Sequence, residues 1–256
     1  MSLRSPAATT QRSGTRKASA CSSSAGAQAP PSTASTAPTS TTCGRSPGAG
    51  GAWSWTQLQP QGTPPPPRWR HSAVWDPEEQ RMLVFGGEGE ATFGDTWSLG
   101  WGGGAWTWSQ LEPEGTLPGP HSRHPAVWDG ESRQMLVYMG SSPWSLSSAD
   151  GVWTWTKLAP SGSAPLARTG SSAVWDADGR RMLVFGGRVT FTGAGSTFLD
   201  DTWALQRDGD AWTWSKVETP PLLPTHRAYH GAAWDRSRGR MIVVGGLDAA
   251  SGAPRC

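Results

Sequence analysis

Short apolar runs alternate with turn-forming residues along this chain, and the same succession of runs occurs four times. Each copy has an apolar segment ending in Trp-Asp, a short polar turn, and a second apolar segment that ends at glycine. The copies occupy residues 68–87, 121–140, 167–187 and 227–246. Because one unit of this length cannot bury its own apolar face, we expect the repeats to pack against one another.

Each apolar run has the composition of a β-strand. In the first copy, AVWD (73–76) and RMLVF (81–85) are rich in β-branched, aromatic and long apolar residues, and the intervening PEEQ is typical of a turn. A tryptophan-bearing segment and then a Trp-x-Trp segment follow. Both rings of Trp-x-Trp lie on one face of a strand, because side chains alternate. The pattern predicts four strands per repeat.

The spacing of the tryptophans sets the order of these strands. From the third-strand Trp to the Trp-x-Trp pair is 9 residues, and from that pair to the next inner Trp is 22. Only the link before the third-strand Trp varies, which places variable loops at 88–95, 141–143 and 188–201. Fifteen of the 17 tryptophans follow this spacing: Trp75, Trp128, Trp175 and Trp234 on inner strands, Trp97, Trp144 and Trp203 on third strands, and Trp53/Trp55, Trp106/Trp108, Trp153/Trp155 and Trp212/Trp214 on fourth strands. Four-stranded sheets stacked around an axis make an all-β propeller.

Composition separates the repeats from the ends of the chain. Residues 1–50 contain 29 Ser, Thr or Ala and almost no large apolar residues, so we expect a disordered leader. The propeller is expected over 53–246 and a tail over 247–256. No apolar run is long enough for a secretory signal or a membrane span, and the compartment stays unassigned.

Charge and cysteine usage narrow the classes of partner. Residues 1–50 hold 5 of the 22 basic residues and none of the 20 acidic ones, so the remainder has a net charge of 17 − 20 = −3. A mildly acidic body argues against nucleic acid as the partner. Cys21, Cys43 and Cys256 lie outside the repeats and predict neither a disulfide framework nor a metal site.

Taken in order, the motifs resemble the kelch repeat. The first copy carries all of its marks: Arg68, His71, Gly86, Gly87, Asp95, Trp97, Trp108 and Leu111. The third copy has Ser171 in place of the histidine, and the second has His121 for the arginine and Met139 for the first glycine. The resemblance covers 53–246 and implies a kelch-type β-propeller, similar to exported or cell-surface bacterial proteins. It differs from WD40 repeats, which end on Trp-Asp after an upstream Gly-His.

The number of blades is left open by the sequence. Three full copies are flanked by a lone fourth strand (53–58) and by a closing first and second strand (227–246). These parts form either a thin composite fourth blade or the ends of an arc from a larger propeller. An open arc has exposed sheet edges, which favour self-association.

The expected binding face follows from the up-and-down order of the strands. The variable loops share a face with Arg68, His121, Arg168 and Arg227, which precede the inner strands. The competing interpretation is that these residues bind backbone carbonyls between blades. His71, His124 and His230 occupy one repeated position, where packing is favoured over a metal ring. Two tryptophans outside the spacing, Trp69 and Trp101, are candidates for exposed aromatics. The candidate binding residues are thus Arg68, His71, His121, Arg168, Arg227, His230, Trp69 and Trp101.

These observations favour a non-enzymatic binding module for a protein or carbohydrate partner, without cofactor or metal. One alternative is a degenerate enzyme of the galactose-oxidase kind, although the only tyrosines are Tyr138 and Tyr229 and no cysteine lies in the repeats. Another is a truncated structural fragment. We expect Arg168→Ala with deletion of 188–199 to abolish partner capture without lowering thermal stability. We also expect hairpin ion pairs from Arg81, Arg133, Arg181 and Arg240 to Asp76, Asp129, Asp176 and Asp235.

Overall fold

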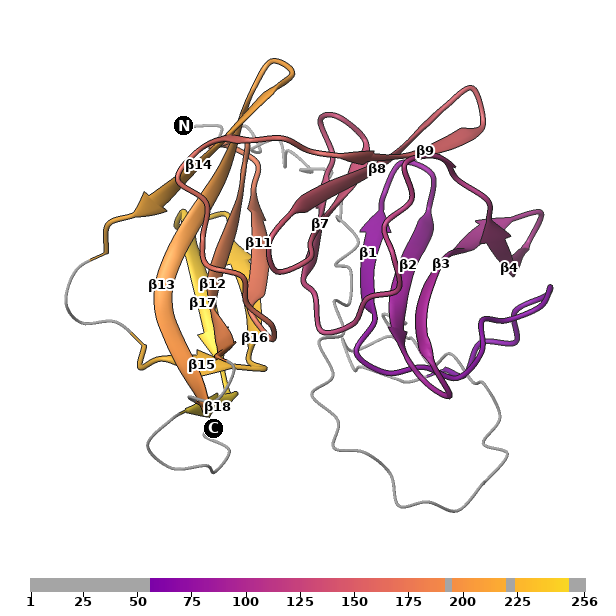
Figure 1. Ribbon diagram of the computed structural model, residues 1–256. Coiled ribbons are helices and arrows are strands. Elements are labelled where there is room, and N and C mark those ends of the chain that lie inside the picture. The colour runs from indigo at the N-terminus through magenta and orange to yellow at the C-terminus, as the bar shows by residue number, and fades with distance from the viewer. Residues whose placement is uncertain (1–55, 192–194, 220–223, 249–256) are drawn as a thin grey trace, which may run out of the picture.

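The computed structural model describes residues 56–191, 195–219 and 224–248, and all regular structure in these ranges is β (Figure 1). The predicted leader (1–50), the Trp53/Trp55 pair, the three cysteines and residues 249–256 of the predicted tail lie outside the described residues.

Each complete repeat forms one antiparallel sheet whose strands follow chain order, which confirms the prediction of four strands per repeat. We call these sheets blades A, B and C. Blade A comprises β1 (Ser72–Asp76), β2 (Arg81–Glu88), β3 (Thr92–Gly102) and β4 (Ala105–Leu111). Blade B comprises β6 (Ala126–Asp129), β7 (Gln134–Tyr138), β8 (Pro143–Ala149) and β9 (Val152–Lys157). Blade C comprises β11 (Ser172–Asp176), β12 (Arg181–Phe191), β13 (Gly195–Asp208) and β14 (Ala211–Val217).

The fourth repeat has only the first two strands of a blade within the described residues. β16 (Gly231–Asp235) and β17 (Arg240–Val244) form an antiparallel pair. A short ladder of β15 (Arg227–Ala228) and β18 (Leu247–Asp248) lies beside them. β18 extends the paired structure two residues beyond position 246, where the sequence predicted the propeller to end.

The links between blades are also fixed by hydrogen bonds. β5 (Glu114–Gly115) adds in parallel to β9, and β10 (Ser161–Gly162) adds in parallel to β14. Gln61 makes the equivalent parallel bridge to Thr107 in β4. Each link therefore lies along the outermost strand of the blade that follows it, and this ties neighbouring blades together at their outer edge.

The blades pack face to face in a single direction. We call the face of a blade toward the preceding repeat its upstream face and the other its downstream face. The upstream face of blade B, with Trp144 and Trp155, covers Val74, Leu83 and Phe85 on the downstream face of blade A. The same arrangement joins blades B and C, where Trp214 meets Tyr138. The inner strands β1, β6, β11 and β16 contact one another in this order.

Among the described residues, no blade covers the downstream face of the fourth repeat. Ile242 and Val244 are 46% and 63% exposed, whereas Leu183 and Phe185, at the same positions of blade C, are 6% and 3% exposed. The described chain is thus an arc of three complete blades and one incomplete blade, with blade A and the fourth repeat at opposite ends (Figure 1). The predicted all-β partial propeller is confirmed.

Candidate binding face

The glycine pair at the end of each second strand forms a β-bulge. The ladder between β2 and β3 shifts between Phe85 and Gly87, and Gly86 has φ 63°. A Cβ on Gly86 would lie 2.5 Å from the carbonyl oxygen of His121, so only glycine fits there. The bulge leaves the Gly86 carbonyl free of the ladder, and Arg68 donates to it from Nη1 at 3.0 Å.

Two motif arginines form buried ion pairs beside this bulge. Arg68 makes two hydrogen bonds with the Asp95 carboxylate at 2.6 and 2.8 Å, and Arg168 makes two with Asp201 at 2.5 and 3.0 Å. Burial alone would raise the pKa of Asp95, but hydrogen bonds from Arg68 and Trp97 lower it below its ordinary value. Each ion pair thereby joins the segment before the first strand of its blade to the third strand.

This geometry corrects one expectation from the sequence. The Arg168 side chain is fully buried and also donates to the Gly186 carbonyl at 3.1 Å. Replacing Arg168 by alanine leaves a half-buried aspartate without its partner, which destabilises the fold. We therefore now expect Arg168→Ala to lower thermal stability, in contrast to the expectation drawn from the sequence for this change combined with deletion of 188–199.

Blade B lacks both members of the pair. His121 stands where the others have arginine, and Ser142 stands where they have aspartate. The His121 backbone instead contacts the preceding blade, since its N–H donates to Phe93 O of blade A at 3.0 Å and its carbonyl accepts from Gly87 N at 2.8 Å. These bonds place the link from the fourth strand of blade A to the first strand of blade B against the loop between the second and third strands of blade A. The two segments therefore lie on one face, as predicted. Burial is the main cause of the lowered pKa of His121.

The repeated histidines connect one blade to the next. His124 lies 2.9 Å from the Ser72 hydroxyl of blade A, and His230 lies 2.7 Å from the Ser172 hydroxyl of blade C. Burial lowers the pKa of His124 to about 3 and that of His230 to about 4. Burial, and then Arg68, lowers the pKa of His71 as well. These contacts give His124 and His230 a place in blade packing.

One repeated position that the sequence reading passed over lines the inner edge of the same face. Five residues before each Trp-Asp tryptophan stand Arg70, Arg123, Gly170 and Tyr229, all in the left-handed backbone region, with φ of 56°, 60°, 68° and 60°. Their backbones form a chain. Arg123 N donates to Arg70 O, Gly170 N to Arg123 O, and Tyr229 N to Gly170 O, at 3.0, 3.1 and 2.7 Å. Three non-glycine residues held in this region are strained, and strain of this kind clusters at ligand sites.

The side chains at this edge form a partly exposed cluster, which we call the inner rim: Arg70, Glu88, Ser122, Arg123, Arg188 and Tyr229. Glu88 accepts hydrogen bonds from Arg70 at 2.7 Å and from Ser122 at 2.5 Å, and lies 3.5 Å from Arg123. Burial would raise the pKa of Glu88, but these partners lower it below its ordinary value. Arg70 and Arg123 share this carboxylate, and Arg188 is a third arginine in the cluster, so the inner rim carries net positive charge.

Tyr229 and Arg188 complete the inner rim on the side of the fourth repeat. The Arg188 guanidinium lies 5.7 Å from the centre of the Tyr229 ring. A Cβ on Gly170 would meet that ring at 2.7 Å, so glycine at this position lets the tyrosine lie across blade C. Within the described residues Arg188 Nε is buried and has no hydrogen-bond partner. The signal for the inner rim was present in the sequence, as a repeated position occupied by Arg, Arg, Gly and Tyr.

The longest variable loop is largely a hairpin. Residues 188–191 and 195–199 continue the β12–β13 ladder beyond the bulge, and Phe191 near its tip is 48% exposed. Trp69 lies near the inner rim, with the Arg70 guanidinium 3.6 Å from its ring centre. Trp101 is 45% exposed but lies at the other end of the strands, where its backbone N–H donates to Gln80 O at 3.1 Å. The structure does not bring Trp101 together with the other candidates.

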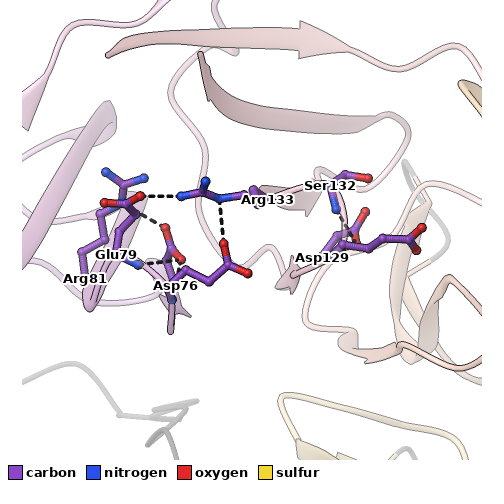
Figure 2. A network of polar contacts seen from close by, with 8 residues as sticks. Asp76, Glu79, Arg81, Asp129, Ser132 and Arg133 are labelled. Carbon is purple, nitrogen blue, oxygen red and sulfur yellow. Dashed lines mark hydrogen bonds and ion pairs between the residues drawn. The ribbon is translucent and has the colours of Figure 1, made fainter. Parts of the chain in front are cut away.

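The opposite edge, which we call the turn rim, is held by ion pairs between blades. Arg133 of blade B contacts Glu79 and Glu78 of blade A at 2.5 and 3.0 Å, as Figure 2 shows for Glu79. Arg180 of blade C contacts Glu131 of blade B at 2.9 Å, and Arg236 of the fourth repeat contacts Asp178 of blade C at 2.7 Å. In each of these ion pairs the acidic residue belongs to the earlier blade and the arginine to the blade or repeat that follows it.

One predicted hairpin ion pair is wrong. Arg81, Arg181 and Arg240 do pair with Asp76, Asp176 and Asp235, at 3.1, 2.9 and 3.1 Å. In blade B, however, Gln134 takes this position and donates to Asp129 at 3.0 Å. Arg133 is one residue earlier, in the turn with φ 53°, and its side chain therefore points to the neighbouring blade.

Within the part that the structure describes, no three His, Cys, Asp or Glu side chains are grouped so as to hold a metal ion. The same residues include no helix with the length and apolar character needed to cross a membrane.

Comparison with known proteins agrees with the blade architecture. A model of the Attractin/LZTR1 β-propeller family matches residues 52–253. Dynein regulatory complex subunit 7 of Chlamydomonas reinhardtii is 34% identical over 89 residues, which is 34% of this chain. The chain spans 7% of that protein's length.

Solved structures give more distant likenesses. A chain in the cryo-EM structure of RAG in complex with one melted RSS and one unmelted RSS has a TM-score of 0.51 at 14% identity, over 69% of this chain and 59% of that one. YjhT has a TM-score of 0.45 at 15% identity, over 79% of this chain and 83% of its own. At such identity the likeness to the RAG chain concerns the fold alone.

Proposed function

Since the chain belongs to the Attractin/LZTR1 β-propeller family, we propose that it is a non-enzymatic protein-interaction module that binds an acidic segment of its partner on the inner rim. The proposal depends chiefly on one observation. Arg70, Arg123 and Tyr229 are held in the left-handed region at one repeated position. Arg70 and Arg123 both contact the Glu88 carboxylate, and the Arg188 guanidinium lies 5.7 Å from the centre of the Tyr229 ring. Fixed guanidinium groups with spare donors suit carboxylates, which they bind in pairs of hydrogen bonds.

The surroundings of the inner rim favour a protein ligand. The hairpin of blade C carries the exposed Phe191 on the same face, and an exposed aromatic ring beside a charged cluster is typical of a protein interface. The partial match to a subunit of the dynein regulatory complex, a protein named as part of an assembly, supports the same class of function. We therefore propose a protein rather than a carbohydrate partner.

The test is direct binding of peptides to the purified full chain. Peptides of equal length and graded Asp and Glu content are labelled, and their affinity is measured by fluorescence anisotropy at low and high salt. We expect affinity to rise with acidic content and to fall with salt. The double variant Arg70→Asn, Arg123→Asn should bind acidic peptides about tenfold more weakly or worse. Asparagine is chosen because it tolerates the left-handed region.

The matched control lies on the turn rim. Arg236→Gln, Arg238→Gln removes two arginines from the opposite edge and should leave peptide affinity unchanged. Thermal melts of both double variants check that the fold is kept. Equal binding of acidic and neutral peptides, or equal loss in the two double variants, would overturn the proposal. A glycan array run in parallel supplies the competing outcome, which is selective binding of a sugar without selection among peptides.

A further inference from the structure

Blades A and C carry opposite charges at one position of the inner rim. Glu88 and Arg188 each directly follow the glycine pair at the end of the second-strand motif of their blade. Their backbones are placed alike, because Glu88 forms an antiparallel bridge with Trp69 and Arg188 forms the same bridge with Thr169. The two side chains therefore start from equivalent points of the two blades and differ in the sign of their charge.

In blade A the charge at this position is neutralised within the chain. The Glu88 carboxylate accepts hydrogen bonds from Arg70 and Ser122 and forms an ion pair with Arg123. The side chains of Arg70, Glu88 and Arg123 are 28%, 22% and 30% exposed, so this group lies at the surface and not in the core. A ligand carboxylate that approaches the two arginines would meet donors that Glu88 already occupies.

In blade C the same position has no counter-charge. Gly170 and Tyr229 stand near Arg188 where the corresponding neighbours of Glu88 are arginines, and neither of them carries a charge. Among the described residues the Arg188 side chain makes no hydrogen bond or ion pair, and its Nε is buried without a partner. A buried guanidinium nitrogen without an acceptor is unfavourable, and a carboxylate is the group that satisfies it best.

The two halves of the inner rim adjoin along the backbone. Gly170 N donates to Arg123 O at 3.1 Å, and Tyr229 N donates to Gly170 O at 2.7 Å. An extended ligand that follows this edge would therefore meet Arg188 and the group around Glu88 in succession. Three arginines and one glutamate give the inner rim a charge of +2, which two ligand carboxylates would balance.

We propose that Glu88 is a built-in substitute for a ligand carboxylate, which the partner displaces on binding. A first acidic side chain of the partner binds Arg188 beside Tyr229. A second one binds Arg70 and Arg123 after Glu88 has turned to solvent, and Glu88 lowers the affinity by competing for these donors. The inner rim thus binds segments with two acidic residues, and the inference rests on the proposed function and adds its regulation.

The experiment compares two labelled peptides of equal length that differ only in carrying one or two glutamates. Their affinity for the purified full chain is measured by fluorescence anisotropy at one salt concentration. Glu88→Gln keeps the shape of the side chain and removes its charge, and should strengthen binding of the two-acid peptide about fivefold. Arg188→Asn should weaken binding of the one-acid peptide about tenfold, because it removes the first contact.

The matched control is Glu90→Gln. Glu90 lies in the same loop as Glu88, is exposed, and forms no ion pair among the described residues. Its replacement removes the same formal charge, so it measures the general gain that any acidic peptide receives through space. The one-acid peptide should respond alike to Glu88→Gln and Glu90→Gln, and only the two-acid peptide should distinguish them.

The outcomes separate this inference from the proposed function. Equal gains from Glu88→Gln and Glu90→Gln with the two-acid peptide, or unchanged one-acid affinity in Arg188→Asn, would overturn the inference. If Arg70→Asn, Arg123→Asn still lost acidic peptides in that case, the proposed function would stand without it. Absence of any preference for acidic peptides would overturn both. Melting temperatures are compared, and Glu88→Ser, which copies Ser141 at this position of blade B, should give the same gain as Glu88→Gln.

Discussion

Blade C and the fourth repeat have nearly the same sequence pattern but differ in their strands and in their packing. Both have the motif arginine, an inner strand with Trp-Asp, a hairpin turn, and a second strand that ends in a glycine bulge. Blade C continues into β13 and β14, whereas within the described residues the fourth repeat returns only as β18. Compared with the described part of the fourth repeat, the last two strands of blade C add cover and charge.

The consequences appear at equivalent side chains. Arg168 meets Asp201, while Arg227 meets backbone and threonine oxygens. Leu183 is buried, while Ile242 is half exposed, because no blade within the described residues packs against it. The sequence motif thus sets where a side chain points, and the neighbouring strand or blade sets how much that side chain contributes to stability.

The largest expected difference is at the arginine. Arg168→Met should lower the free energy of unfolding by about 3–5 kcal/mol, because it leaves Asp201 partly buried without its partner. Arg227→Met should cost about 1 kcal/mol, the value of hydrogen bonds to neutral oxygens. Urea unfolding followed by circular dichroism measures both. Similar costs at the two positions would show that blade C and the fourth repeat do not differ in the way described.

The next difference is in the apolar packing. Leu183→Ala should cost about 2–5 kcal/mol, because it opens a cavity between blade C and the fourth repeat. Ile242→Ala, at the same position one repeat later, should cost about 0.5 kcal/mol, as for a surface position. The two variants delete similar apolar groups, so each serves as the control for the other. A large cost for Ile242→Ala would mean that this face is covered in solution.

A smaller effect concerns pH at the junction of blade C with the fourth repeat. Burial lowers the pKa of His230 to about 4, so the unfolded chain takes up a proton near pH 6.5 and the folded one does not. The stability associated with neutral His230 is present above pH 6.5 and is lost as the pH falls toward 4. We expect His230→Gln to remove about 2 kcal/mol of the loss between pH 7 and pH 4.5.

The measurement is urea unfolding at both pH values. His124, whose pKa burial lowers to about 3, remains in the variant and keeps part of the pH dependence. The junction of blades B and C is the internal comparison. The residue equivalent to His230 there is Ser171, so this junction has no histidine to titrate at that position. An unchanged slope with pH in His230→Gln would contradict the assignment.

The smallest effect is expected on the turn rim. Arg236 and Asp178 are both well exposed, so Arg236→Gln should shift the thermal midpoint only slightly, and the shift should vanish at high salt. Scanning calorimetry at two salt concentrations tests this. A shift that persists at high salt would indicate that the ion pair between blade C and the fourth repeat is shielded from solvent.

Local pattern accounts for most of the strands and for the seams between blades. Alternating apolar residues, turn residues and a constant tryptophan spacing predicted four strands per repeat, with both rings of each Trp-x-Trp pair against one neighbouring sheet. In the structure Trp153 and Trp155 pack in this way against blade A. Periodicity and spacing are properties of neighbouring residues, so a single sequence contains them. The expected common face for the variable loops and the strand 4–1 links has the same origin.

The candidate site was only partly predictable. The sequence selected Arg68 and Arg168 as motif residues, but burial and their aspartates occupy both side chains. The inner rim arises from residues of four repeats whose left-handed backbones are joined by hydrogen bonds, and no local pattern reports that closeness. A one-residue shift in the turn of blade B likewise sent Arg133 to blade A instead of to Asp129.

The sequence by itself determined the strands, the glycine bulges and the tryptophan seams, because each depends on the chemistry of a few adjacent residues. Only the tertiary structure decided which charged groups meet, which arginine has no carboxylate in the described chain, and which apolar face is uncovered. Those outcomes depend on distances between residues about fifty positions apart, which are set by how whole blades stack.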